Sequence, residues 1–267
     1  MAEPENLSSA ELVEAALGCD EDQRWEYISI LHQRGSEVEF ALALPLTTSG
    51  DKARRTLGAD ILGQLGSPEP TFVQASVAQL IVMLDDPEPE VLCAVATALG
   101  HRGDPSAIPH LVELKNHDSE QVRYGVAFGI SCHDDELAIA TLIELTNDTN
   151  ELVRDWATFA LGSQSASDSE AIRAALLARL NDTDENIRAE AIVGLTRRGY
   201  EESAKLVLKE LGRGIVSSLL LEAAEMIGDP VLYPPLRLLS NDLASVEDFE
   251  LREALDDALE ACEPKGA

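Results

Sequence analysis

The chain has 267 residues, with 49 acidic and 20 basic side chains and a formal net charge of −29. This balance excludes general nucleic-acid binding, because neutralising phosphates requires a dense set of Lys and Arg. It also disfavours anionic membrane surfaces. Hydrophobic residues make up 45% of the chain, so it is not a disordered acidic tail. Aromatic residues make up only 4%, and the apolar residues are mostly Ala, Leu, Val and Ile, which favours helices over a β-sandwich.

The chain contains no apolar run of about 18 residues that would predict a transmembrane helix. Residues 1–17 lack the basic region and the apolar stretch of a signal peptide. The four cysteines, Cys19, Cys93, Cys132 and Cys262, lie far apart and form no Cys-x-x-Cys pair. We therefore expect reduced thiols in a cytoplasmic protein with no membrane partner.

The first predicted element is an N-terminal capping helix within residues 1–19, because Ser8-Ser9-Ala10-Glu11 has the pattern of a capping box. A repeated pattern then runs through the chain. One position, usually Arg, recurs every 31 to 37 residues. This Arg column consists of Arg24, Arg55, Leu92, Arg123, Arg154, Arg188, Leu220 and Arg252.

The position seven residues after the Arg column is aliphatic in every copy. With the apolar positions one before and three after the Arg, it forms an i, i+4, i+8 stripe on a helix of about three turns. A small residue such as Gly129 or Gly194 often precedes it and would let a neighbouring helix approach closely. Glycines at the ends of several copies predict left-handed C-caps. These are Gly63, Gly100, Gly162 and Gly228.

A second helix follows the first in each of the later copies, with prolines at or near several of its first turns. Polar turns that contain Asp118, Asp148 and Asp182 then precede the next first helix and are expected to supply its N-cap. The predicted second helices are residues 105–114, 135–145, 169–180, 202–211 and 231–239.

Helices this short are marginal in isolation, so stacking must bury their apolar stripes in one continuous core. We therefore predict an all-α fold, a right-handed α-solenoid of about eight helix pairs. The solenoid is expected to form a single domain over residues 1–267. Its acidic C-terminal cap would occupy residues 241–267, with a last helix over residues 246–261.

The repeats resemble HEAT-like repeats of the phycobilisome-lyase type. The shared signature is Asp, then Val-Arg, two spaced Ala, Leu-Gly, a turn and an Ala-Ile-Pro-x-Leu second helix. Residues 151–199 and 221–229 are also similar to bacterial HEAT-repeat proteins encoded beside rearrangement-hotspot (Rhs) toxins, some of which are regarded as immunity proteins. Repeat motifs of this kind specify a fold better than a function. The best matches to the signature are residues 86–114, 118–145, 148–180 and 182–211.

An arginine of the first helix and an aspartate of the preceding turn recur together in three successive repeats. One interpretation is an anion site. We favour a structural role, in which each Arg pairs with a turn Asp or caps backbone carbonyls between stacked repeats, because a bidentate Arg–carboxylate pair suits a half-buried contact. These residues are Arg123, Arg154 and Arg188 with Asp118, Asp148 and Asp182.

Residues 132–136 (Cys-His-Asp-Asp-Glu) gather metal-ligand types in one loop, but adjacent Cys and His do not readily reach one ion and no zinc spacing occurs. We predict a solvated turn, with no metal and no cofactor. HEAT-based metal hydroxylases use repeated His-Glu pairs, and this chain has none. HEAT-like DNA glycosylases need a basic groove, which the net charge disfavours. No nucleotide-binding loop or catalytic triad occurs, so we predict a protein that is not an enzyme.

The favoured hypothesis is a protein-interaction scaffold that attracts a basic partner, such as an immunity protein that neutralises a basic toxin. A bilin lyase-like factor and a general adaptor remain alternatives. The concave surface is expected to be lined by second helices. The predicted contact residues are His110, Glu113, Thr141, Glu144, Arg173, Lys205 and Lys209.

Overall fold

A computed structural model describes residues 3–242 and 248–264, and this part of the chain contains sixteen α-helices and no strand. The predicted all-α solenoid of about eight helix pairs is confirmed. The α-helices are α1 (Ser9–Gly18), α2 (Glu21–Arg34), α3 (Glu37–Thr47), α4 (Lys52–Gln64), α5 (Val73–Val82), α6 (Pro89–Arg102), α7 (Ile108–Val112), α8 (Glu120–Ile130), α9 (Glu136–Leu145), α10 (Glu151–Phe159), α11 (Glu170–Arg179), α12 (Glu185–Arg197), α13 (Ser203–Gly212), α14 (Ser218–Ile227), α15 (Tyr233–Asp242) and α16 (Phe249–Cys262).

Short helical turns supplement the α-helices. They are the 3-10 turns η1 (Pro4–Asn6), η2 (Met83–Asp85), η3 (Pro105–Ala107) and η5 (Pro230–Leu232), and the π-helical turn η4 (Ala160–Gln164). The predicted helix over residues 105–114 is thus a 3-10 turn followed by the short α7. The predicted last helix begins later, at Phe249, where the Asp248 carboxylate accepts a hydrogen bond from the backbone N–H of Leu251 at 3.0 Å. Residues 243–247 lie outside the described residues.

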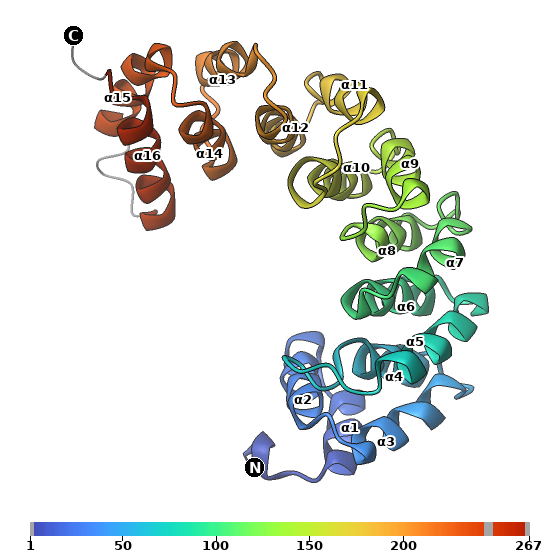
Figure 1. Ribbon diagram of the computed structural model, residues 1–267. Helices are drawn as coiled ribbons and strands as arrows, with labels where there is room; N and C mark the ends of the chain where they lie inside the picture. The colour runs from blue at the N-terminus through green and yellow to red at the C-terminus, as the bar shows by residue number, and fades with distance from the viewer. Residues whose placement is uncertain (1–2, 243–247, 265–267) are drawn as a thin grey trace. The chain divides into compact units, whose positions relative to one another are not determined.

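Two compact units make up the chain, an N-terminal unit (Met1–Thr141) and a C-terminal unit (Leu142–Ala267). The division falls inside α9. Within each unit the helices alternate between two rows (Figure 1). The helices that carry the Arg column form the inner row, which is α2, α4, α6 and α8 in the N-terminal unit and α10, α12, α14 and α16 in the C-terminal unit. The second helices α5, α7, α11, α13 and α15, together with α3, form the outer row.

Side-chain caps begin many of the helices. Ser8 and Glu11 form the predicted capping box at the start of α1. The turn aspartates, however, are not the N-caps of the inner helices. Asp148 and Asp182 instead accept hydrogen bonds from backbone N–H groups two residues further on, at 2.8 Å and 3.2 Å. The N-cap follows each turn, at Asn150 for α10 and at Asp184 for α12.

The predicted glycine C-caps are mostly wrong. Gly228 ends α14 in the left-handed region (φ 57°), as expected. The other three lie within helical turns, where a neighbouring helix crosses closely. A Cβ atom at Gly63, for example, would lie 2.9 Å from the Cβ atom of Ala98 on α6. The left-handed cap of α6 is Gly103, three residues beyond the predicted position. The misassigned residues are Gly63, Gly100 and Gly162.

Close contact between successive inner helices shapes the core. A Cβ atom at Gly129 of α8 would lie 2.8 Å from the carbonyl oxygen of Ala96 on α6. In the C-terminal unit, a Cβ atom at Gly194 of α12 would lie 2.6 Å from the Cα atom of Gly162. The predicted close approach at small residues is confirmed at these positions. Most of the aliphatic positions beside them are fully buried, including Leu31, Leu62, Leu99, Ile130, Leu161 and Leu195.

Replacing Gly194 by Ala is expected to lower the free energy of unfolding by about 1–3 kcal/mol, because the added methyl group has no room at the α12 crossing. Gly212→Ala is the matched control, since no heavy atom lies within 4 Å of a Cβ atom built there. The control should be neutral or slightly stabilising in urea denaturation. Equal effects of the two substitutions would contradict the proposed close contact.

Candidate functional site

The arginine of the Arg column links successive repeats. In the C-terminal unit, Arg154 of α10 donates to both carboxylate oxygens of Asp182, at 2.9 Å from Nε and 3.1 Å from Nη2. Its Nη1 donates to the backbone carbonyls of Asp148 and Thr149 in its own turn, at 3.0 Å and 3.3 Å. Both charged side chains are largely buried, with 14% of Arg154 and 4% of Asp182 exposed. The Arg154 guanidinium therefore links the turn that precedes α10 to the turn that precedes α12.

Other members of the column have different partners. Arg55 pairs with Asp86 in the N-terminal unit, at 2.6 Å and 3.0 Å. Arg123 donates to the backbone carbonyls of His117 and Asp118, at 2.9 Å and 3.2 Å. Arg188 also caps its own turn, but its carboxylate partner is Glu210 of α13, at 3.0 Å and 3.1 Å. These guanidinium groups hold the protein's own oxygens, which argues against an anion site.

Asp182→Asn is expected to lower the free energy of unfolding at pH 7 by about 3 kcal/mol, because it leaves the buried Arg154 guanidinium without its counter-charge. Burial alone would raise the pKa of Asp182, but its hydrogen bonds with Arg154 and the Asp184 backbone, together with the nearby Arg charges, hold that pKa below 3.8. The carboxylate therefore stabilises the fold above that pH, and the contribution is lost as the pH falls further.

Glu14→Gln is the control for this test. Glu14 also pairs with an arginine, Arg54, at 3.2 Å, but both side chains lie at the surface. Its removal should shift the denaturation midpoint little at any pH. A similar loss in both variants would mean that burial does not strengthen the Arg154–Asp182 pair.

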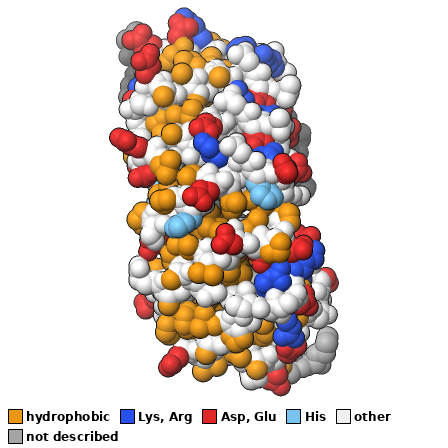
Figure 2. Space-filling view, turned by 90° about the vertical axis from the view of Figure 1, so that its right-hand side faces the viewer, with side chains coloured by type: hydrophobic (Ala, Val, Ile, Leu, Met, Phe, Trp, Pro, Cys, Tyr) orange, Lys and Arg blue, Asp and Glu red, His pale blue; other side chains and the backbone are white. Residues whose placement is uncertain are grey.

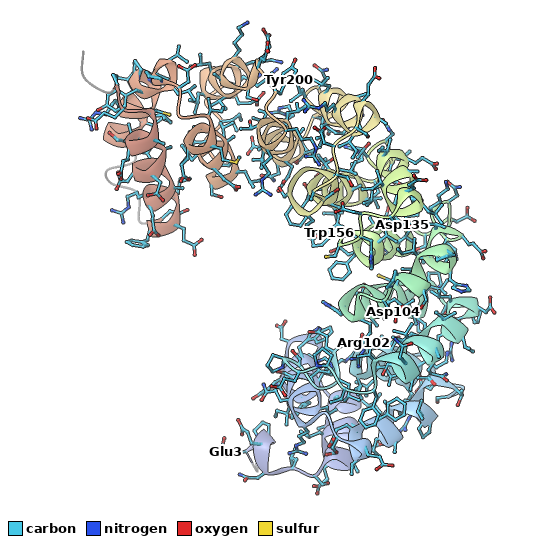
Figure 3. All side chains as sticks on the ribbon, in the orientation of Figure 1. Glu3, Arg102, Asp104, Asp135, Trp156 and Tyr200 are labelled. Carbon is cyan, nitrogen blue, oxygen red and sulfur yellow. The ribbon has the colours of Figure 1, made fainter. Side chains whose placement is uncertain are left out.

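A second set of structural arginines was missed in the sequence analysis. It lies ten positions after the Arg column, at the C-terminal ends of inner helices. Arg198 makes six hydrogen bonds to five backbone carbonyls of the preceding repeat and its own helix. Arg102 donates to the carbonyls of Leu62 and Leu65, at 2.5 Å and 3.2 Å, and burial lowers its pKa to about 10 (Figure 3). The constant spacing of ten from Arg188 and Leu92 is the sequence signal that could have found them.

The predicted contact residues lie on or beside the outer helices, although the sequence analysis expected these helices to line the concave side. The inner row occupies that side in each unit (Figure 1). Thr141 is a further correction, because only 1% of it is exposed and it is not accessible to a partner. Arg173 and Lys205 bind their own neighbours Asp168 and Glu202, at 2.7 Å and 2.6 Å. The other predicted contact residues are exposed, namely His110, Glu113, Glu144 and Lys209.

Hydrophobic side chains gather in patches on the face that Figure 2 shows, which is the side of the outer helices. The exposed hydrophobic side chains on the outer helices of the N-terminal unit include Val38 of α3, which is 59% exposed, and Val82 of α5, which is 68% exposed. The segments 40–50 and 70–84, which hold most of these two helices, contain no charged residue. The negative charge of the chain is thus not spread evenly over its surface.

Acidic residues dominate the inner row of the C-terminal unit. They occur on four successive inner helices, whose basic side chains are Arg154, Arg188, Arg197 and Arg252. The Arg197 guanidinium is bound to Glu222 at 2.8 Å and to the carbonyl oxygen of Ser163 at 2.7 Å. We call this set the acidic row. It consists of Asp155 on α10, Glu190 on α12, Glu222 and Glu225 on α14, and Glu253, Asp256 and Asp257 on α16.

Glu190 is the buried member of the acidic row, with 7% of it exposed. Its carboxylate accepts a hydrogen bond from the hydroxyl of Ser163 at 3.1 Å. Burial raises the pKa of Glu190 to about 7, and the neighbouring carboxylates of Asp155 and Glu222 add to this rise, while Ser163 and Arg197 oppose it. The pKa of Asp155 is raised by burial as well. Glu190 therefore changes its charge near neutral pH.

The raised pKa predicts a pH-dependent stability. The folded chain holds a proton on Glu190 more tightly than the unfolded chain, so Glu190 stabilises the fold below about pH 4.5. This contribution is lost as the pH rises towards 7. The denaturation midpoint of the unmodified chain should therefore fall between about pH 5 and about pH 8 by more than that of Glu190→Gln. Glu225→Gln, an exposed neighbour, should keep the original profile, and an unchanged profile in Glu190→Gln would refute the explanation.

The inner row of the N-terminal unit also carries titratable groups whose pKa values burial shifts. Burial raises the pKa of Asp60 to about 7, although the charge of Arg24 opposes the rise. Burial also lowers the pKa values of His32 and His101 and raises that of Cys93. The two imidazoles are therefore largely neutral near pH 7, whereas Asp60, like Glu190, changes its charge there.

The Cys132–Glu136 loop shows no metal geometry. Within residues 3–242 and 248–264, no three His, Cys, Asp or Glu side chains are grouped so that they could hold a metal ion. Asp135 instead accepts hydrogen bonds from the backbone N–H groups of Leu137 and Ala138, at 2.8 Å and 3.4 Å, at the start of α9. Among the described helices, none has the length and apolar character required to span a bilayer.

The repeat architecture and the matching sequence define the class of protein. A family model described as HEAT repeats matches residues 40–131 and 139–228, and the chain belongs to the HEAT repeat family. A search of curated proteins gives no match.

Three solved structures show what the chain is similar to. The X-ray structure of YibA from Escherichia coli is 28% identical with a TM-score of 0.70, over 96% of this chain and 94% of YibA. The complex of CpcE and CpcF of phycocyanin lyase from Nostoc is 17% identical with a TM-score of 0.50, over 97% and 96% of the two chains. A designed armadillo repeat protein in complex with the peptide (KR)4 is 20% identical with a TM-score of 0.50, over 85% and 100%. The last two likenesses concern the fold alone.

Proposed function

We propose that this chain is a non-enzymatic scaffold that binds a basic protein through the acidic row of its C-terminal unit. The observation that carries the proposal is the row itself, in which acidic side chains occupy successive inner helices. A basic partner would relieve the repulsion between these carboxylates on binding. The net charge of −29 would in addition steer a cationic partner towards the chain over a long range.

Two further features support this proposal. Many of the chain's arginines bind its own carboxylates and carbonyls, so they do not neutralise the acidic row. The designed armadillo repeat protein, whose fold is similar, is in complex with a peptide of alternating Lys and Arg. An acidic helical solenoid has the charge that complements such a sequence.

We further propose that the partner is a basic toxin domain and that the chain acts as its immunity protein. The resemblance of residues 151–199 and 221–229 to HEAT-repeat proteins encoded beside Rhs toxins supports this role. Many toxins that act on nucleic acids are basic, which fits the charge of the acidic row. Cys19, Cys93 and Cys262 are free thiols, which fits a cytoplasmic protein.

A bilin lyase-like role is the second candidate. The likeness to CpcE and CpcF extends over 97% of this chain and favours it. The two candidates differ in their partners, since an immunity protein requires a toxin domain and a lyase requires a phycobiliprotein and its chromophore. Addition of chromophore to a phycobiliprotein in the presence of this chain would support the second candidate.

The acidic row is tested with the peptide (KR)4 as probe, by calorimetric titration at several salt concentrations. Binding should weaken steeply between about 50 mM and about 500 mM salt, because the Debye length falls from about 14 Å to about 4 Å. Glu225→Gln combined with Glu253→Gln should weaken binding about tenfold. Glu170→Gln combined with Glu201→Gln removes the same charge from exposed positions outside the acidic row and is the control. Equal losses in both pairs would show that only the net charge matters.

The immunity role is tested by co-expression with the C-terminal domain encoded by the gene directly upstream. Copurification and rescue of growth are the expected results, and both should fail in the Glu225→Gln, Glu253→Gln variant. If the unmodified chain does not rescue growth, the immunity role is excluded. The titration with (KR)4 still tests the binding of basic peptides on its own.

A further inference from the structure

Two adjoining hollows open along the inner row of the N-terminal unit. The larger one has a volume of about 450 Å³, and the smaller one has a volume of about 90 Å³. They share Gln64 and Ser67, so they form one continuous depression across α2, α4 and α6, which we call the polar groove. Its lining residues are Ser29, His32, Gln33, Gly63, Gln64, Ser67, Pro68, Pro70, His101 and Arg102.

Several side chains of the polar groove have unused hydrogen-bonding capacity. Within the described residues, the amide of Gln64 and the hydroxyl of Ser67 make no hydrogen bond to the protein, and the amide of Gln33 makes one long contact of 3.4 Å to Ser29. An amide side chain both donates and accepts, as a peptide bond does. The groove therefore offers paired donors and acceptors.

The repeat places these groups in line. Gln33, Gln64 and His101 each lie nine positions after the Arg column, on α2, α4 and α6. Neighbouring helices pack about 8–10 Å apart, which is the length of about three residues of an extended chain. An extended peptide that crosses the groove would thus meet one of these side chains at about every third residue.

The charge of the polar groove disfavours ionic ligands. The guanidinium of Arg102 is bound to Leu62, Leu65 and Thr71 carbonyls, so it is not directed at a ligand. The imidazole of His32 is 7% exposed and bonded to the backbone oxygen of Asp60 at 2.9 Å. Burial lowers the pKa of both His32 and His101, so these rings are largely neutral near pH 7.

We propose that the polar groove binds an extended, uncharged segment of a partner protein through its peptide backbone. This inference rests on the proposed scaffold function and assigns the N-terminal unit a second, neutral contact with the partner. The amides of Gln33 and Gln64 bond to backbone N–H and C=O groups of the segment. Pro68 and Pro70 supply the apolar wall against which its side chains pack.

The test uses a phage-displayed library of random peptides of about twelve residues, selected against the unmodified chain. The peptides expected to be enriched are poor in Lys and Arg, and their affinity should be nearly independent of salt between about 50 mM and about 500 mM. Gln33→Ala combined with Gln64→Ala should weaken their binding at least about tenfold, because two backbone contacts are lost.

Three further variants complete the design. Gln23→Ala combined with Gln121→Ala removes two exposed amides outside the groove and should leave affinity unchanged. Ser67→Trp fills the groove from an exposed loop and should block binding even if the glutamine variant folds poorly. Glu225→Gln combined with Glu253→Gln changes only the acidic row and should have no effect on these peptides.

The outcome separates this inference from the proposed function. Enrichment of only Lys- and Arg-rich peptides that dissociate at high salt would support the acidic row and overturn the polar groove. Peptides that bind equally well to the unmodified chain, to the Gln33→Ala, Gln64→Ala variant and to Ser67→Trp would also overturn it. Failure to enrich any peptide would also overturn the proposal that the polar groove binds a peptide segment.

Discussion

The structure depends on one constraint: the aliphatic stripe of each repeat must be buried, and no single helix pair can cover it. Successive inner helices solve it by direct contact, and the contact is close enough that Gly129 and Gly194 leave no space for a side chain. The spacing between repeats in each unit follows from this contact. It places the turn of one repeat within reach of an arginine of the previous one, as in Arg154 and Asp182. It also aligns equivalent side chains on neighbouring helices.

The helix pairs could be predicted from the sequence because the aliphatic column and the small residues beside it obey one helical period. The partners of individual charges could not all be predicted. The Arg154–Asp182 pair joins positions that the repeat itself relates, whereas Arg188 pairs with Glu210 on a second helix, whose phase the repeat does not fix. Which row lies on the concave side could not be predicted either, because the helices of both rows are amphipathic. Thr141 was misjudged for the same reason, since a hydroxyl suits either a surface or a buried helix seam.

Because many basic residues bind groups within the protein, the net charge does not describe the charge that the surface presents. Arginines that bind backbone carbonyls or buried carboxylates contribute to folding and little to the external field. The acidic groups are divided in the same way, because turn aspartates and N-caps are part of the repeat, while Glu225, Glu253, Asp256 and Asp257 of the acidic row are exposed. The groove in one unit uses side chains nine positions after the Arg column, whereas the carboxylate-lined row in the other uses positions one to five after it. The arginines engaged in this way include Arg34, Arg55, Arg102, Arg154, Arg188 and Arg198.

The bond between Arg154 and Asp182 has a consequence for how such chains change during evolution. Arg55 and Arg154 are each encoded in one repeat and their carboxylates in the next, so neither repeat is a self-sufficient module. Deleting or duplicating a single repeat preserves such a bond only if the new neighbour carries a turn aspartate. Arg188 is the exception, because its acceptor Glu210 lies on α13 of the same repeat. The heritable building block is therefore a matched junction between two repeats, and recombination within a helix pair should be tolerated better than recombination between pairs.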